Sequence, residues 1–154
     1  YPFSESGFGT KFSNPATLPA ANAEGVTFSS AGDAIAVGHN SSPYVSAYPW
    51  SESGFGAKFS DPSTLPTGAG NDVAFTDAGD AIAVAHSSSP FVSAYPWSGS
   101  GFGTKFVNPG TLPAGTVRGV EFTKAGDAIN ALANMVSEME RRYTLMSKTK
   151  TKNI

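Results

Sequence analysis

Two histidines have the most versatile side chains in this sequence, because imidazole can bind metals and exchange protons near neutral pH. His39 and His86 lie 47 residues apart, and each ends a short apolar run, AIAVGH and AIAVAH. The chain contains no cysteine, which removes thiolate metal ligands, disulfides and cysteine nucleophiles. A histidine at the end of a strand is more often a structural hydrogen-bonding residue than a metal ligand. The sequence therefore predicts neither a metal site nor a cofactor.

Glycine-rich runs of the form Gly-Phe-Gly-x-Lys could suggest a phosphate-binding loop. They occur at residues 7–11, 54–58 and 101–105. They lack the phosphate-loop spacing and no helical pattern follows them, so we interpret them as tight loops whose Phe packs between repeats. The aspartates of the Ala-Gly-Asp turns do not follow a calcium-loop spacing. The sequence has no recognisable arrangement of a nucleophile, a base and an acid. We therefore predict no catalytic residues, and we expect that the protein is not an enzyme.

An aromatic-proline element is the most functional-looking feature. Tyr48 and Trp50 flank one proline, and Tyr95 and Trp97 flank another. Proline cannot donate a hydrogen bond within a sheet, so it marks a strand end or bulge. The flanking rings point to the same face in an alternating strand. They form either a stacking platform for sugars or partner loops, or part of the core between repeats. We favour the core interpretation and keep the four rings as candidate ligand-binding residues.

All these motifs recur because the chain is built from a 47-residue unit. Residues 1–47 and 48–94 match at 31 of 47 positions without a gap, and a third, partial copy covers 95–129. Four strand-like runs are separated by turn signals, and consecutive short strands joined by short loops predict an antiparallel meander. In the second copy these runs are 72–76, 81–86, 91–97 and 104–107, and the third copy keeps only the first run, at 119–123.

A four-stranded meander of this length that recurs in tandem is typical of a β-propeller blade. Val73–Phe75 with the following Gly79-Asp80 resembles the VxFSPDG-like segment of WD-repeat and YVTN-type blades. Ile82–Val84 and Val92–Trp97 resemble the strand pair that follows it, without the Gly-His start and Trp-Asp end of a true WD repeat. The resemblance implies an all-β fold of tandem four-stranded antiparallel blades. About two and a half blades are present, so the ring is incomplete.

The composition changes abruptly after Ile129, where Ala, Leu, Met, Glu and Arg replace Gly, Pro and Ser. This change predicts a repeat region over 1–126, an amphipathic C-terminal α-helix over 127–147 and a frayed basic tail over 148–154. The helix is too short to be stable alone, so we expect it to pack on the repeats or to pair with copies of itself. Apolar residues at heptad spacing form the expected oligomerisation seam: Ile129, Leu132, Val136, Met139, Tyr143 and Met146.

The charge distribution limits the expected partners. Residues 1–129 contain five Lys and Arg against ten Asp and Glu, so we expect no nucleic acid. No apolar run reaches the roughly 18 residues of a membrane span, so we expect no membrane partner. Open ends of an incomplete ring would expose strand edges, which predicts a homo-oligomer or a larger assembly.

Nearly identical blades present nearly identical surfaces, which suits multivalent binding or a structural ring better than one asymmetric catalytic centre. We therefore expect a non-catalytic structural or binding module that assembles through open blade edges and the C-terminal helix. A similarity to highly repetitive propeller proteins of phages and bacteria favours a virion or extracellular component. The alternative is a lectin-like propeller that binds carbohydrate multivalently. A lactonase-type or hydrolase-type enzyme would need different residues from different blades and is the least favoured hypothesis.

Overall fold

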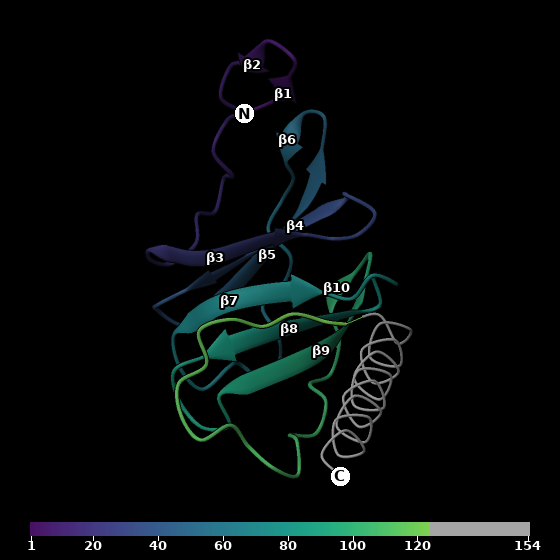
Figure 1. Cartoon of the computed structure of the whole chain (residues 1–154). Helices are drawn as coiled ribbons and strands as arrows, with labels where there is room; N and C mark the ends of the chain where they lie inside the picture. Colours follow the sequence, from purple (N-terminus) through teal and green to yellow (C-terminus); the bar gives the residue numbers. More distant parts are fainter. Residues whose placement is uncertain (124–154) are drawn as a thin grey trace, which may run out of the picture. The chain divides into compact units, whose positions relative to one another are not determined.

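The chain folds into antiparallel β-sheets in a computed structural model that describes residues 1–123 (Figure 1). This part contains ten strands and no helix. The all-β prediction is confirmed, whereas the predicted helix over 127–147 and its heptad seam lie outside the described residues. The strands are β1 (Phe3–Ser4), β2 (Gly7–Phe8), β3 (Ala23–Phe28), β4 (Ala34–His39), β5 (Val45–Ser51), β6 (Gly54–Phe55), β7 (Gly70–Phe75), β8 (Ala81–His86), β9 (Val92–Ser98) and β10 (Gly101–Phe102).

Each four-stranded meander takes its strands from two successive 47-residue units, and from here on the first repeat means the sheet β3–β6 and the second repeat the sheet β7–β10. The sheets have the orders β3-β4-β5-β6 and β7-β8-β9-β10, and β1 and β2 form a separate two-stranded hairpin. The outer hairpins share one register, since Trp50 pairs with Phe55 and Trp97 pairs with Phe102. Phe3 pairs with Phe8 in the same way in β1–β2. The β1–β2 hairpin therefore has the structure of the outer edge of a repeat.

A hydroxyl group organises the first turn of each sheet. The Ser29 Oγ accepts hydrogen bonds from the backbone N–H groups of Asp33 (3.1 Å) and Ala34 (3.0 Å) and donates to Asp33 Oδ1 (2.7 Å). Thr76 makes the same bonds with Asp80 and Ala81 in the second sheet. The acidic turn residue thus orients the hydroxyl that satisfies the backbone of the turn.

Small side chains allow the second sheet to pack closely on the first. Strand β7 contacts both β3 and β4. The buried cluster between the sheets combines alanines and valine of the first repeat with larger side chains of the second. Its members are Ala34, Ala36, Val45, Ala47, Val73, Phe75, Ile82, Val84, Tyr95 and Trp97. Large groups from one sheet therefore pack into the space that small groups leave on the other.

Glycines bring the two backbones into contact at the inner end of the sheets. A Cβ on Gly38 would lie 2.8 Å from the Gly70 carbonyl oxygen, and a Cβ on Gly25 would lie 2.7 Å from the Asp72 Cα. A Cβ on Gly70 would overlap the carbonyl oxygen of Tyr44. These contacts leave no room for a side chain, so glycine is required there.

Two strand predictions are wrong. The predicted fourth strand at 104–107 is replaced by β10 at Gly101–Phe102, because the ladder with β9 ends at Pro96. Gly103 donates to the Pro96 carbonyl (2.8 Å), but proline has no N–H to return the bond. The predicted first strand of the third copy at 119–123 is also not formed. That strand pairs with the strand after it in both complete repeats, and its counterpart at 128–133 lies outside the described residues.

A side chain at the glycine contact should destabilise the protein. We expect Gly70→Ala to lower the free energy of unfolding by about 1–3 kcal/mol, the usual cost of overpacking. Gly99→Ala is the matched control, because nothing lies within 4 Å of its added Cβ. Urea unfolding followed by tryptophan fluorescence measures both variants. Equal midpoints for the two variants would contradict the close packing.

Candidate functional site

Trp50 is the centre of an aromatic cluster in the first repeat. Its ring makes edge-to-face contacts with Phe12 (5.1 Å between centroids), Phe28 (5.3 Å) and Phe55 (4.9 Å). These rings come from three places, the segment before β3, β3 itself and β6. The geometry is the one that aromatic pairs prefer, and it anchors the outer hairpin to the inner strand of the same sheet.

The second repeat repeats this cluster around Trp97. The partners are Phe59 (5.2 Å), Phe75 (5.0 Å) and Phe102 (5.1 Å). Phe59 also joins the two sheets, because its backbone N–H donates to the Ala47 carbonyl in β5 (2.9 Å). The aromatic-proline elements therefore contribute to packing within and between repeats.

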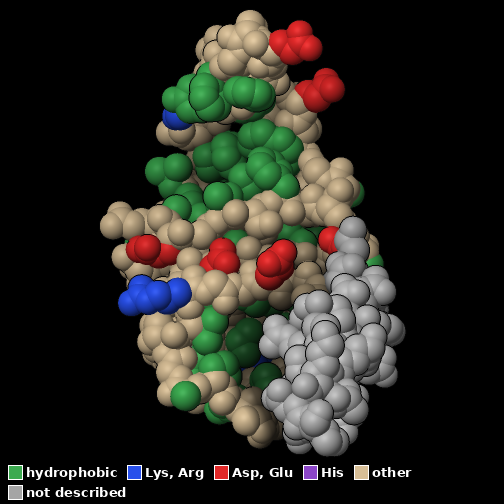
Figure 2. Space-filling view, in the orientation of Figure 1, with side chains coloured by type: hydrophobic (Ala, Val, Ile, Leu, Met, Phe, Trp, Pro, Cys, Tyr) green, Lys and Arg blue, Asp and Glu red, His purple; other side chains and the backbone are tan. Residues whose placement is uncertain are grey.

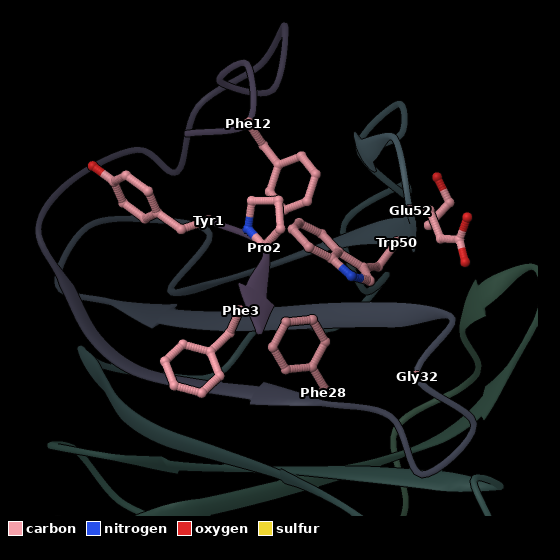
Figure 3. A pocket seen from close by; sticks show the side chains of 9 residues that line it. Tyr1, Pro2, Phe3, Phe12, Phe28, Gly32, Trp50 and Glu52 are labelled. Carbon is pink, nitrogen blue, oxygen red and sulfur yellow. The ribbon is translucent and has the colours of Figure 1, made fainter. Parts of the chain in front are cut away.

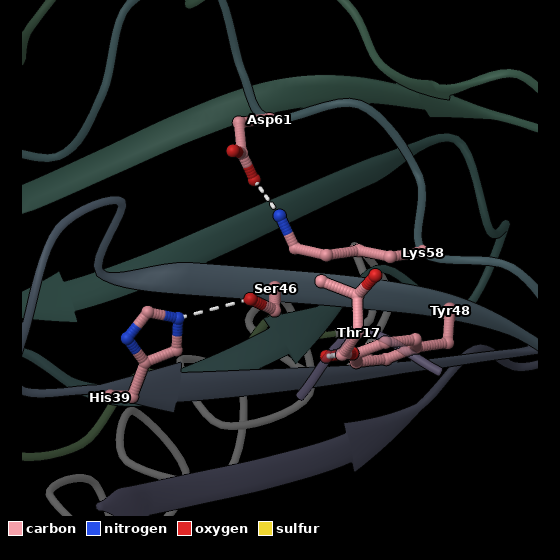
Figure 4. Close-up of polar contacts among 6 residues, drawn as sticks. All are labelled: Thr17, His39, Ser46, Tyr48, Lys58 and Asp61. Atoms are coloured by element: carbon pink, nitrogen blue, oxygen red, sulfur yellow. Dashed lines mark hydrogen bonds and ion pairs between the residues drawn. The ribbon is translucent and has the colours of Figure 1, made fainter. Parts of the chain in front are cut away.

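The two tyrosines of the candidate ligand set are completely buried. The Tyr48 hydroxyl donates to the Thr17 carbonyl (2.9 Å; Figure 4). The Tyr95 hydroxyl donates to the Thr64 carbonyl (2.8 Å). Burial raises the pKa of Tyr95 to about 12, because it penalises the phenolate. Neither ring has an open face on which a sugar could stack.

The other two members of that set differ in exposure. Trp97 is 8% exposed, whereas Trp50 is half-buried and borders a pocket of about 740 Å³. The pocket lies between the β1–β2 hairpin and the first four-stranded sheet (Figure 3). Its lining is mainly aromatic, with one carboxylate at the edge: Tyr1, Pro2, Phe3, Phe12, Phe28, Gly32, Trp50, Ser51 and Glu52.

The first sheet has an open apolar face next to this pocket. Val26 is 60% exposed and Phe28 is 49% exposed, whereas their counterparts Val73 and Phe75 are 2% and 8% exposed. The first sheet covers Val73 and Phe75, and no complete repeat covers the matching face of β3 within residues 1–123. Figure 2 shows hydrophobic side chains gathered between the hairpin and the first sheet. We call Val26 and Phe28 the open face.

Both histidines are fully buried and paired with serine. The Nε2 atom of His39 lies 3.1 Å from the Ser46 Oγ, as Figure 4 shows, and that of His86 lies 3.0 Å from the Ser93 Oγ. No hydrogen bond of good geometry reaches either Nδ1 atom, although backbone groups at Ser41 and Ser88 lie near enough to raise the pKa slightly. Burial is the larger effect and lowers the pKa of both rings below the usual 6.5.

The charged residues of the glycine-rich loops serve local contacts. Lys58 forms an ion pair with Asp61 (Figure 4), and Lys11 and Lys105 contact Asn14 and Asn108 at the same spacing. Within residues 1–123, no group of three or more His, Cys, Asp or Glu side chains could hold a metal ion. The described part also contains no helix that is long and apolar enough to cross a membrane.

Comparison with models of protein families and with curated proteins finds no match for this chain.

Sequence reasoning missed the open face and the residues around Trp50. The available signal was the recurrence of phenylalanine every 47 residues, at 12, 59 and 106 and again at 28, 75 and 122. Their difference in burial could not be predicted, because it depends on which repeat has a neighbour on each side.

The buried histidines predict a loss of stability in mild acid. Their pKa is lower in the folded protein than in the unfolded chain, so the unfolded chain binds more protons below about pH 6.5. We expect the free energy of unfolding to fall as the pH decreases from 7 to 5, by up to about 1.4 kcal/mol per pH unit and histidine. Urea unfolding at several pH values measures this slope. A His39→Gln/His86→Gln variant should have a flatter profile, and an unchanged slope would contradict the assignment.

Proposed function

We propose that this chain is a non-catalytic structural or binding module of β-propeller type that assembles through the open face of its first sheet. The observation that carries the proposal is the difference in burial between equivalent side chains. Val26 and Phe28 are exposed where Val73 and Phe75 are buried. The meander order and the 47-residue period support the propeller-type arrangement.

The interface between the two sheets indicates which surface would fit the open face. Val73 and Phe75 pack against the alanines of β4 and β5, of which Ala36 and Ala47 are fully buried. The open face has the same apolar side chains in the same register, so a surface of that kind should bind it. Burying a side chain such as Val or Phe contributes roughly 1.5–3 kcal/mol, which favours association.

The recurring polar residues support a non-catalytic role. The histidines bond to serines of the adjacent strand, and the turn aspartates bond to the hydroxyl groups of their own turns. Equivalent residues occupy equivalent places in both repeats. An active site requires different groups that converge on one reacting atom, and these side chains instead stabilise each sheet separately.

A carbohydrate-binding function is the second candidate, because the pocket beside Trp50 combines aromatic rings with the Glu52 carboxylate. Rings that stack on sugars and a carboxylate that accepts hydroxyl hydrogen bonds are a suitable combination for such a ligand. Of the four candidate rings, Trp50 is the one that borders this pocket.

A charge on the open face should prevent assembly. We expect the unaltered chain to have a mass above that of the 15.8 kDa monomer in light scattering, and Val26→Lys to shift the mass toward the monomer. The side chain is already 60% exposed, so circular dichroism of the variant should be unchanged. Val107→Lys is the matched control, since Val107 is 95% exposed and lies outside the open face. A concentration of about 100 µM is on the order of the dissociation constant of a weak complex. If the unaltered chain is a monomer at this concentration, the assembly proposal is excluded.

The carbohydrate hypothesis has a separate test. A glycan array should give a hit whose affinity decreases about tenfold in Glu52→Gln, because a hydrogen bond to a charged group contributes about 1.5–3 kcal/mol. Glu5→Gln is the control, because Glu5 occupies the same repeat position in β1–β2 but does not line the pocket. An array without hits, or equal effects of the two variants, would exclude this candidate.

A further inference from the structure

The four-ring aromatic cluster occurs twice in full, and its four positions recur a third time at the two ends of the described chain. The segment before β3 supplies Phe12, and 47 and 94 residues later the sequence has Phe59 and Phe106. Strand β3 supplies Phe28, and its later counterparts are Phe75 and Phe122. The outer-hairpin positions, Trp50 and Phe55, have earlier counterparts at Phe3 and Phe8. One cluster is thus divided between the ends of the repeat array.

The C-terminal half of this cluster is positioned like its counterparts. Phe106 donates its backbone N–H to the Ala94 carbonyl (2.9 Å), as Phe59 does to Ala47. Its ring is nevertheless 48% exposed. The position that would supply its tryptophan, 47 residues after Trp97, is Thr144 in the sequence. Phe106 therefore lies where a ring of this cluster belongs. The sequence of the third repeat does not supply the tryptophan that the ring contacts in the complete repeats.

The N-terminal half has the complementary geometry. Phe3 and Phe8 contact each other edge to face at 5.3 Å, close to the 4.9 and 5.1 Å of the corresponding pairs in the complete repeats. They are 75% and 78% exposed. The β1–β2 hairpin therefore presents two preformed cluster rings to solvent.

A glycine in each outer hairpin shows where the missing ring would fit. Gly54 and Gly101 have φ values of 95° and 94°, and a Cβ on either would lie 3.1 Å from the ring of Phe12 or Phe59. Gly7 has the same φ of 95°, but nothing lies within 4 Å of its Cβ position. The space beside Gly7 is thus the space that Phe12 and Phe59 fill in the complete repeats.

We propose that the β1–β2 hairpin of a second copy of this chain binds at Phe106 and Phe122, head to tail, and completes the third aromatic cluster. The inference rests on the proposed function, because it names the partner of the assembly. The same contact places Tyr1 near Thr111 of the other copy, the residue 47 positions after Thr64. The Tyr1 hydroxyl then makes the bond to a threonine carbonyl that Tyr48 and Tyr95 make in the complete repeats.

Engineered cysteines test the contact directly, because the chain has none of its own. We expect Gly7→Cys/Phe106→Cys to form covalent dimers or larger disulfide-linked species in non-reducing electrophoresis. The matched control is Gly54→Cys/Phe12→Cys, where the two Cβ positions lie 3.1 Å apart within one chain, near the range of disulfides. The control should form its disulfide and remain monomeric. Mixing the two single variants, Gly7→Cys and Phe106→Cys, should give a heterodimer if the contact is head to tail.

Light scattering provides a test that does not depend on cysteine. We expect Phe106→Ser to weaken the association between copies at least tenfold, since burying such a ring contributes roughly 1.5–3 kcal/mol, and Val107→Ser to leave it unchanged. If Val26→Lys dissociates the assembly but Phe106→Ser does not, and no covalent dimer forms, the head-to-tail contact is wrong while the proposed function stands. If the unaltered chain is a monomer, both are wrong.

Discussion

The contact between the glycine and alanine surfaces of adjacent repeats is the constraint on which the rest of this structure depends. Because Gly38 and Gly70 have no side chains, the backbones of the two sheets approach closely at their inner ends. Fully buried Ala36 and Ala47 leave space on the first sheet, and the second sheet fills it with large side chains. Each repeat therefore has one surface of small side chains and one surface of large side chains, and each surface becomes buried only against the opposite surface of an adjacent repeat.

This dependence explains why equivalent residues differ in exposure. Val73 and Val26 are the same residue type at the same register position. Burial between the sheets stabilises Val73, whereas Val26 lacks this stabilisation because it remains exposed. The pocket near Trp50 is lined by Phe28 and Trp50, whose counterparts Phe75 and Trp97 lie in one buried cluster with residues of β4 and β5. The assembly that we propose therefore uses the open face, where apolar side chains lack a packing partner within residues 1–123.

The sequence predicted the repeat, its period and the antiparallel meanders, because glycine, proline and alternating apolar residues specify turns and strands locally. It favoured the core interpretation of the aromatic-proline rings while keeping them as candidate ligand-binding residues; Tyr48, Tyr95 and Trp97 are buried, whereas Trp50 borders the pocket. It placed the fourth strand at 104–107 instead of Gly101–Phe102. Pro96 ends the ladder between β9 and β10, and this effect can be predicted only when the pairing of the two strands is known. The burial of Phe28 and Phe75 could not be derived from residue type, because the two positions carry the same side chain and differ only in what lies beside them.

Asp72 occupies a position at which adjacent repeats carry different residues. Its carboxylate lies against Gly25 of the preceding repeat and accepts the backbone N–H of Val120 from the following one (3.0 Å). The equivalent positions are Gly25 and Gly119, so the acid occurs in one repeat and glycine in its neighbours. Three carboxylates at this place would clash and repel one another. A side chain at this position in one repeat therefore requires glycine at the equivalent position of the repeat before it, so the two repeats are not interchangeable in order.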